Sequence, residues 1–400
     1  MNNYIFKFPE PVNEPILSYA PQSQERTELV AELDRQSSQE MDIPLIIGGK
    51  EIRTGNTQKV VMPHRHSHVL ATFHLAGPQE IEMAIDAALR SKQEWMTISW
   101  VERASIMMKA AELIAQKYRS LLNASTMLGQ SKNAYQAEID AACESIDFLR
   151  FNNHFASRIY TNQPLSTPGY LDRVEYRPLE GFILAITPFN FTAIALNLTT
   201  CVALMGNTVV WKPSFSSVLS NYHVMKILQE SGLPDGVINF VPCPGPLMSE
   251  TAMKHRELAG LHFTGSTEVF NHLWKTVGDN LSRYRSYPRL VGETGGKDFI
   301  FVHRSADPAE VATAIVRGAF EYQGQKCSAA SRAYVPKSLW GAVREIVLDN
   351  LKCIKMGDVR DFSNFVNAVI DDKAYHNIMG YLEAAKGTRE AEIIAGGKGD

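Results

Sequence analysis

The chain has 400 residues, of which 45% are hydrophobic and 21% charged, the proportions of a globular protein with a sizeable core. This length exceeds one ordinary domain, so two or three domains are expected. The formal net charge is −3, and no basic run with interleaved aromatics occurs, which argues against nucleic acid or an acidic membrane surface as a partner.

Membrane spans, export and disulfides are not indicated by the sequence. No stretch reaches the ~18 uninterrupted apolar residues of a transmembrane helix. The first residues lack an apolar signal-peptide core and include Glu10 and Glu14, unlike an Arg-rich mitochondrial transit peptide. The five cysteines are scattered and form no C-x-x-C pair. We therefore expect a cytoplasmic protein with reduced thiols and, since no His or carboxylate cluster occurs, no catalytic metal.

The first part of the chain predicts mainly helices. Apolar spacing indicates a short helix at 24–36, a small hairpin at 46–52, and a helix at 78–95 that begins at a proline. Several further helices are expected over 101–156, with Gly129 as one break.

From about residue 181 the pattern changes to short apolar strands that alternate with helices. Such alternation predicts a parallel α/β sheet with ligands beyond the carboxyl ends of its strands. The expected strands are 182–186, 208–211, 237–241 and 258–263, and the helices between and after them are 192–204, 217–231, 247–254 and 267–277. A second unit is expected to contain a strand at 299–302, a helix at 308–322, a strand at 333–335 and a strand at 393–394.

Polar residues follow three of these strands. Asn190 can donate its side-chain amide to a developing oxyanion, or it can simply cap the next helix. Lys212 can bond ribose or phosphate, or it can be an ordinary solvated lysine. Gly265 and Ser266 open a helix whose free N–H groups suit phosphate, although an ordinary capped turn explains them equally well.

One thiol and one carboxylate give the strongest indication of catalysis. Glu293 lies in a glycine-rich segment that predicts a turn, and Cys327 follows a helix between Lys326 and Ser328. A thiolate is the attacking species, and an adjacent cation favours it. The alternative for Cys327 is a small core hydrophobe, which is the interpretation we give to Cys201 within its apolar helix.

Five motifs in register resemble the aldehyde dehydrogenase superfamily. They are TPFN, WKPS, FTGS, GETGGK and GQKCSA, and they occur in this order over residues 181–330. The resemblance implies an α/β aldehyde dehydrogenase fold with four parts. These are an N-terminal arm and helical part (1–160), an oligomerisation hairpin (161–178), a Rossmann-like NAD-binding region (179–291) and a catalytic domain (292–400).

Within the superfamily the chain is most similar to the dehydrogenases of proline degradation that oxidise L-glutamate γ-semialdehyde, in equilibrium with 1-pyrroline-5-carboxylate, to L-glutamate. The segments AEIDAA, FLRFN, PFNFTAI and FVHRSAD carry this similarity. The resemblance implies that Cys327 attacks the aldehyde and that Asn190 and the Cys327 backbone N–H hold the oxyanion. After hydride transfer to the nicotinamide, Glu293 activates the water that releases the acid from a cysteine thioester.

The resemblance also implies the binding residues. The cofactor is NAD, with NADP left open because Phe215 stands where many family members carry an acidic residue. The implied cofactor contacts are Thr187, Lys212, Ser214, Gly265 and Ser266, and the implied substrate contacts are Glu144, Phe191, Lys326 and Ser328.

Three further expectations complete the prediction. Family members continue beyond the position that matches Asp400, so the catalytic domain is expected to be C-terminally incomplete. The complete protein is expected to form a homo-oligomer. The alternatives are a non-catalytic cofactor-binding or assembly module, a dehydrogenase for another aldehyde, and a CoA-acylating relative, against which Glu293 argues because acyl transfer to CoA needs no base for water.

Overall fold

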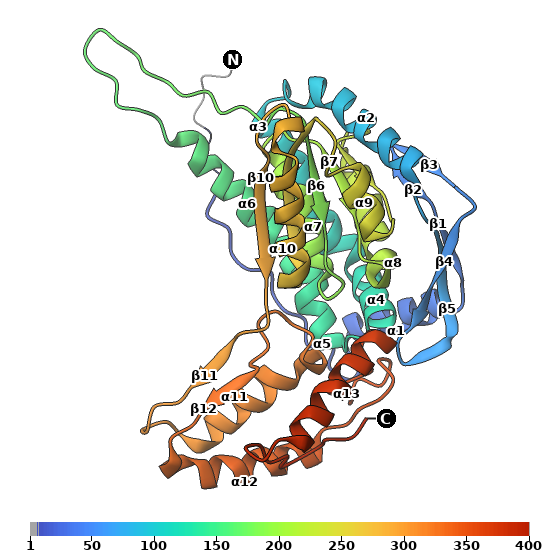
Figure 1. Cartoon of the computed structure of the whole chain (residues 1–400), viewed down its shortest axis with the longest axis vertical. Coiled ribbons are helices and arrows are strands. Elements are labelled where there is room, and N and C mark those ends of the chain that lie inside the picture. Colours follow the sequence, from blue (N-terminus) through green and yellow to red (C-terminus); the bar gives the residue numbers. More distant parts are fainter. Residues whose placement is uncertain (1–5, 7, 400) are drawn as a thin grey trace.

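The computed structural model describes residues 6 and 8–399. Its largest element is a seven-stranded sheet in the order β10-β9-β6-β7-β8-β2-β3 (Figure 1). Five of these strands run parallel, and the predicted small hairpin of β2 and β3 continues the sheet in antiparallel fashion. Their bounds are β2 Leu45–Ile47, β3 Lys50–Ile52, β6 Phe182–Ile186, β7 Val209–Lys212, β8 Ile238–Phe240, β9 Leu258–Gly265 and β10 Arg289–Thr294.

Helices cover both faces of this sheet because its strands are apolar on both sides. On β6, Ala185 packs into a core shared with the long helices, while Phe182 and Leu184 pack into a second core on the opposite face. The first face carries α1 Gln24–Ser37, α3 Trp100–Leu113, α4 Arg119–Gln130, α6 Glu144–Thr161, α7 Thr192–Leu204 and α8 Val218–Ser231. The second carries α2 Pro78–Trp95, α9 Gly245–Thr251 and α10 Thr267–Asp279. The predicted α/β architecture is therefore confirmed.

The long helical region contains two wide turns that the sequence did not predict. π-Helical segments occupy Ile114–Tyr118 and Glu138–Cys143, the second between the short α5, Ala134–Ala137, and α6. The break expected at Gly129 is confirmed, since α4 ends at Gln130, directly after Gly129. The chain leaves the helix at Ser131, whose φ of 60° is left-handed.

A smaller unit follows β10 and lies at the lower end of the molecule in Figure 1. It contains β11 Phe299–Phe301 paired in parallel with β12 Arg332–Tyr334, and it has its own apolar core. Its helices are α11 Pro308–Phe320, α12 Lys337–Cys353 and α13 Asp372–Gly387, with a 3-10 turn at Glu321–Gly324. The strand expected at 393–394 is wrong, since no regular structure occurs there.

Two further segments differ from expectation. A separate sheet in the order β1-β5-β4, built from β1 Met41–Ile43, β4 Thr57–Met62 and β5 Arg65–His74, was not predicted. Residues 162–178 leave the body as a long out-and-back excursion (Figure 1). The expected hairpin is not formed as paired strands; instead Val174 N donates to the Gln163 side-chain oxygen at 2.9 Å.

Within residues 6 and 8–399, no helix is both long and apolar enough to cross a membrane.

Candidate active site

Three loops meet at Cys327, and a glycine makes the meeting possible. A Cβ placed on Gly295 would lie 2.4 Å from the Cys327 Cβ, much closer than side-chain carbons approach. The backbone N–H of Gly296 donates to the Cys327 carbonyl at 3.2 Å. From the loop after β6, Asn190 Nδ2 donates to the Gln325 carbonyl at 2.9 Å. The structure thus brings together the segments of all three predicted catalytic residues.

Asn190 is not a helix cap. The N-cap position of α7 belongs to Phe191, so the structural alternative for Asn190 is wrong. Its side-chain oxygen is buried and has no hydrogen-bond partner among the described residues.

Glu293 lies in a strand and not in a turn, which corrects the sequence-based expectation. It is part of β10 and pairs in register with Thr264 of β9. Its side chain is exposed, and β10 is the edge strand of the sheet in the described part of the chain. The rigid sheet edge therefore carries the carboxylate, while only Gly295 and Gly296 beyond it form the loop that packs on Cys327.

The Cys327 thiol is half-buried and is not activated by its neighbouring lysine. Burial raises its pKa above the ordinary value of 9.0, and the Glu293 carboxylate raises it further. The expectation that Lys326 favours the thiolate is not supported, because the Lys326 ammonium lies 3.3 Å from Asp140 Oδ2 and 3.8 Å from Glu321 Oε2. The thiol is therefore protonated at neutral pH in this state.

The loop that carries Cys327 has an uncommon backbone. Tyr322 and Gln323 have left-handed φ values of 50° and 57°, followed by Gly324 at 71°. Non-glycine residues adopt such angles only where surrounding contacts hold them. The Tyr322 hydroxyl donates to the Gln130 carbonyl at 2.7 Å, and Gln323 Nε2 donates to the Ala368 carbonyl at 2.8 Å. Sequence analysis missed both residues, because these angles depend on contacts with distant segments.

Three of the four predicted substrate residues share one region. The ring centroid of Phe191 lies 5.6 Å from the Lys326 Nζ, and 4.2 Å from the Nζ of Lys132, a buried residue that the sequence analysis missed. Burial, and then Asp140, raises the pKa of Glu144 to about 7, whereas Lys132 and Lys326 lower it. Ser328, the fourth, is exposed. It lies on the loop that carries Cys327, residues 322–328, which we call the nucleophile loop.

The predicted cofactor residues lie at the carboxyl ends of β6, β7 and β9. The Thr187 hydroxyl accepts a hydrogen bond from the Trp211 indole at 3.0 Å, so its own hydrogen remains available to a ligand. Burial lowers the pKa of Lys212, and within residues 6 and 8–399 no carboxylate forms a salt bridge with it. Ser214 precedes a single 3-10 turn, Phe215–Ser217.

The beginning of α10 completes this edge. Ser266 is its N-cap and accepts from the Val269 N–H at 3.3 Å, which confirms the capping interpretation. The buried hydroxyl of Thr264 has no partner in the described part of the chain. Lys212 forms no salt bridge among the described residues and donates to the Pro213 carbonyl at 3.2 Å. Together with the Thr264 hydroxyl and the N-terminus of α10, it provides donors of the kind that bind a dinucleotide at this edge of a sheet. These residues fit NAD.

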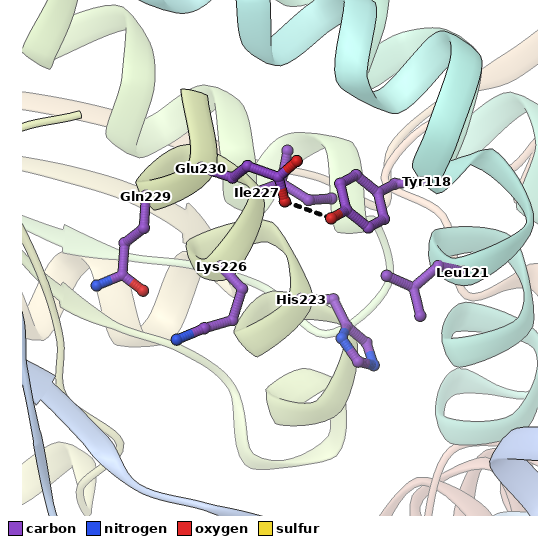
Figure 2. A pocket seen from close by; sticks show the side chains of 7 residues that line it. All are labelled: Tyr118, Leu121, His223, Lys226, Ile227, Gln229 and Glu230. Atoms are coloured by element: carbon purple, nitrogen blue, oxygen red, sulfur yellow. Dashed lines mark hydrogen bonds between the residues drawn. The ribbon is translucent and has the colours of Figure 1, made fainter. Parts of the chain in front are cut away.

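A different hollow, of about 410 Å³, lies between α8 and the start of α4 (Figure 2). It is lined by Tyr118, Leu121, His223, Lys226, Ile227, Gln229 and Glu230. None of the predicted site residues contributes to it. Among the described residues, no group of three or more His, Cys, Asp or Glu side chains could hold a metal ion.

We predict that Gly295→Ala lowers the free energy of unfolding by about 1–3 kcal/mol, because the added methyl group collides with Cys327. Gly278→Ala in α10, where a Cβ meets nothing within 4 Å, is the matched control and should change stability by only about 1 kcal/mol or less. Denaturant titration of both variants measures the difference. Equal stability of the two variants would show that the two loops do not touch.

We also predict that carbamidomethylation of Cys327 by iodoacetamide is slow at pH 7 and accelerates about tenfold per pH unit to beyond pH 9. Glu293→Gln should shift this profile to lower pH, because it removes the second cause of the raised pKa. Peptide mass spectrometry follows Cys327, with the exposed Cys353 as the internal control that should not shift. An unchanged Cys327 profile would mean that Glu293 does not act on the thiol.

Comparison with known proteins agrees with this geometry. A family model described as the aldehyde dehydrogenase family matches residues 51–400. The mitochondrial Delta-1-pyrroline-5-carboxylate dehydrogenase of Dictyostelium discoideum is 50% identical over 395 residues, which cover 98% of this chain and 71% of that protein. The human protein of the same name is 46% identical, covering 97% of this chain and 69% of the relative.

Solved structures show the same fold. The Delta-pyrroline-5-carboxylate dehydrogenase from Mycobacterium tuberculosis, bound with NAD, has a TM-score of 0.97 and 48% identity, and the match covers 100% of this chain and 75% of that one. The 1-pyrroline-5-carboxylate dehydrogenase from Thermus with bound NAD has a TM-score of 0.91 and 29% identity, over 98% and 76% of the two chains. On these sequence and structural matches, this chain belongs to the aldehyde dehydrogenase family.

Proposed function

We propose that this chain catalyses the NAD-dependent oxidation of L-glutamate γ-semialdehyde, which is in equilibrium with 1-pyrroline-5-carboxylate, to L-glutamate. The observation that carries the proposal is the convergence of the Asn190, Glu293 and Cys327 segments, joined by the Asn190–Gln325 and Gly296–Cys327 hydrogen bonds. Relatives at 46–50% identity are Delta-1-pyrroline-5-carboxylate dehydrogenases, which supports this substrate over other aldehydes.

The proposed reaction begins with the Cys327 sulfur. The thiol transfers its proton to solvent water and the sulfur forms a bond to the aldehyde carbon, while negative charge moves to the aldehyde oxygen. Asn190 Nδ2 and the Cys327 backbone N–H donate to that oxygen and stabilise the charge as it develops. NAD⁺, when bound, supplies the acceptor for the hydride that leaves the same carbon. Cys327 is then acylated as a thioester.

Glu293 completes the proposed reaction. Its carboxylate accepts a proton from water, the water oxygen attacks the thioester carbon, and the Cys327 sulfur leaves as the thiolate. An exposed carboxylate on a rigid strand suits this role, because it can exchange its proton with solvent between turnovers. The same Glu293 charge raises the pKa of the Cys327 thiol, so it disfavours the thiolate that would otherwise react with other electrophiles.

The proposed binding roles follow from the polar and charged side chains near the sheet edge and near Cys327. Thr187, Lys212, Ser214, Gly265 and Ser266 would hold NAD. The substrate carries one ammonium and one carboxylate, for which Glu144 and Lys326 offer the complementary charges. Phe191, whose ring centroid lies 5.6 Å from Lys326 Nζ, would contact the aliphatic stem. Ser328, exposed beside Cys327, would add a hydrogen bond to the substrate carboxylate.

We further propose that the protein assembles as a homo-oligomer through the excursion at residues 162–178. Leu165 is 92% exposed, Tyr170 75% and Leu171 79%. An apolar group of this size on a protruding segment is typical of a protein–protein contact.

The purified chain should form NADH when it is given 1-pyrroline-5-carboxylate and NAD⁺. The absorbance of NADH measures the rate. Cys327→Ala should reduce the rate to background, because the proposed thioester forms on the Cys327 sulfur. Asn190→Ala should lower kcat by about 10²–10³-fold. Cys353→Ala, which removes an exposed thiol on α12, should leave the rate unchanged.

Two results would contradict the proposal. Turnover that survives Cys327→Ala would exclude the covalent mechanism. A folded wild-type chain that binds NAD without any turnover would favour the alternative of a non-catalytic cofactor-binding or assembly module.

A further inference from the structure

A buried group of charges lies behind the nucleophile loop, and the proposed reaction leaves two of its members without a role. The side chains of Lys132 and Asp140 are 0% and 2% exposed, and they form a salt bridge. Burial lowers the pKa of Lys132 to about 8. An ion pair removed so completely from water is costly to bury, so its retention beside an active site needs a reason.

One oxygen of Asp140 serves two lysines. Asp140 Oδ2 accepts from Lys132 Nζ and lies 3.3 Å from Lys326 Nζ. Lys326 has a second, longer contact of 3.8 Å with Glu321. Glu321 is already engaged, since it pairs with Arg317 and accepts from the Gln136 side chain at 2.9 Å. Asp140 is therefore the main anchor of the Lys326 ammonium.

Aromatic rings fix the other side of the group. The Lys132 ammonium lies 4.2 Å from the centroid of Phe191 and 4.3 Å from that of Tyr322. Tyr322 belongs to the strained turn that delivers Cys327, and Phe191 adjoins Asn190. The Lys132–Asp140 pair thus connects the loop that carries Asn190 with the nucleophile loop. Lys326 extends from this pair toward the proposed substrate residues.

We propose that Asp140 is a positioning residue that acts through Lys326: it fixes the Lys326 ammonium for the α-carboxylate of the amino-acid substrate, while Lys132 serves only to balance the charge of Asp140 in the protein interior. This inference rests on the proposed function. The competing explanation is that Asp140 only stabilises the fold by neutralising Lys132.

The test measures how well L-glutamate protects Cys327 from iodoacetamide, and it needs no turnover. Asp140→Asn alone would leave Lys132 buried and unpaired, which can unfold the chain. The working variant is therefore Lys132→Met/Asp140→Asn, which removes both charges together. Lys132→Met alone keeps Asp140 and is the matched control. Lys326→Gln removes the proposed carboxylate contact directly.

If Asp140 acts through Lys326, the loss of glutamate binding caused by removing Asp140 and the loss caused by removing Lys326 do not add. Lys132→Met/Asp140→Asn and Lys326→Gln should each raise the half-protecting glutamate concentration about tenfold, the loss of one charged hydrogen bond. Lys132→Met alone should stay within about threefold, and the triple variant should also show only about a tenfold rise. γ-Aminobutyrate lacks the α-carboxylate, so its half-protecting concentration should be nearly the same in every variant as in the wild-type chain.

Three outcomes would overturn the inference. A rise of about a hundredfold in the triple variant would mean that Asp140 and Lys326 act independently. A Lys132→Met variant as impaired as Lys132→Met/Asp140→Asn would mean that the pair is only structural. Failure of L-glutamate to protect the wild-type chain would instead remove the proposed substrate class, and this inference with it.

Discussion

The candidate site depends on the close approach of Gly295 to Cys327. Any side chain at position 295 would occupy the space of the Cys327 Cβ, so two segments from different structural units can meet only through a glycine. This contact joins the edge of the large sheet, through β10, to the smaller unit that carries the nucleophile. The position of Cys327 relative to Glu293 therefore depends on packing between units and not on sequence proximity.

Burial of charge is the second constraint on the site. Lys212 is held at the sheet edge without a salt-bridge partner in the described part of the chain, whereas Lys132 and Lys326 share Asp140. Desolvation lowers the pKa of Lys212 and Lys132 and raises those of Glu144 and Cys327. The charged form of each of these groups would be stabilised by an opposite charge or a hydrogen bond from a ligand. Such groups are typical of a site that binds a polar ligand.

Much of the fold could be predicted because apolar periodicity and caps were strong. The helix at Pro78–Trp95 and the strand at Phe182–Ile186 have the predicted bounds. Exposed strands were harder: β10 has no buried face to produce alternation, and Glu293 was therefore placed in a turn. The π-helical segment Glu138–Cys143 adds a residue per turn that a 3.6-residue pattern cannot reveal. Adjacency in the sequence predicts that the Lys326 ammonium stabilises the Cys327 thiolate, but in the structure this ammonium pairs with Asp140.

The central claim is that Cys327 carries the acyl group, and its most direct test is a single turnover by Glu293→Gln. This variant lacks the base for water, so it should release about one NADH per chain and stop. Peptide mass spectrometry of the acid-quenched protein should then find the acyl adduct on Cys327. NADH release without an adduct, or with an adduct on Cys201 or another cysteine, would contradict the account.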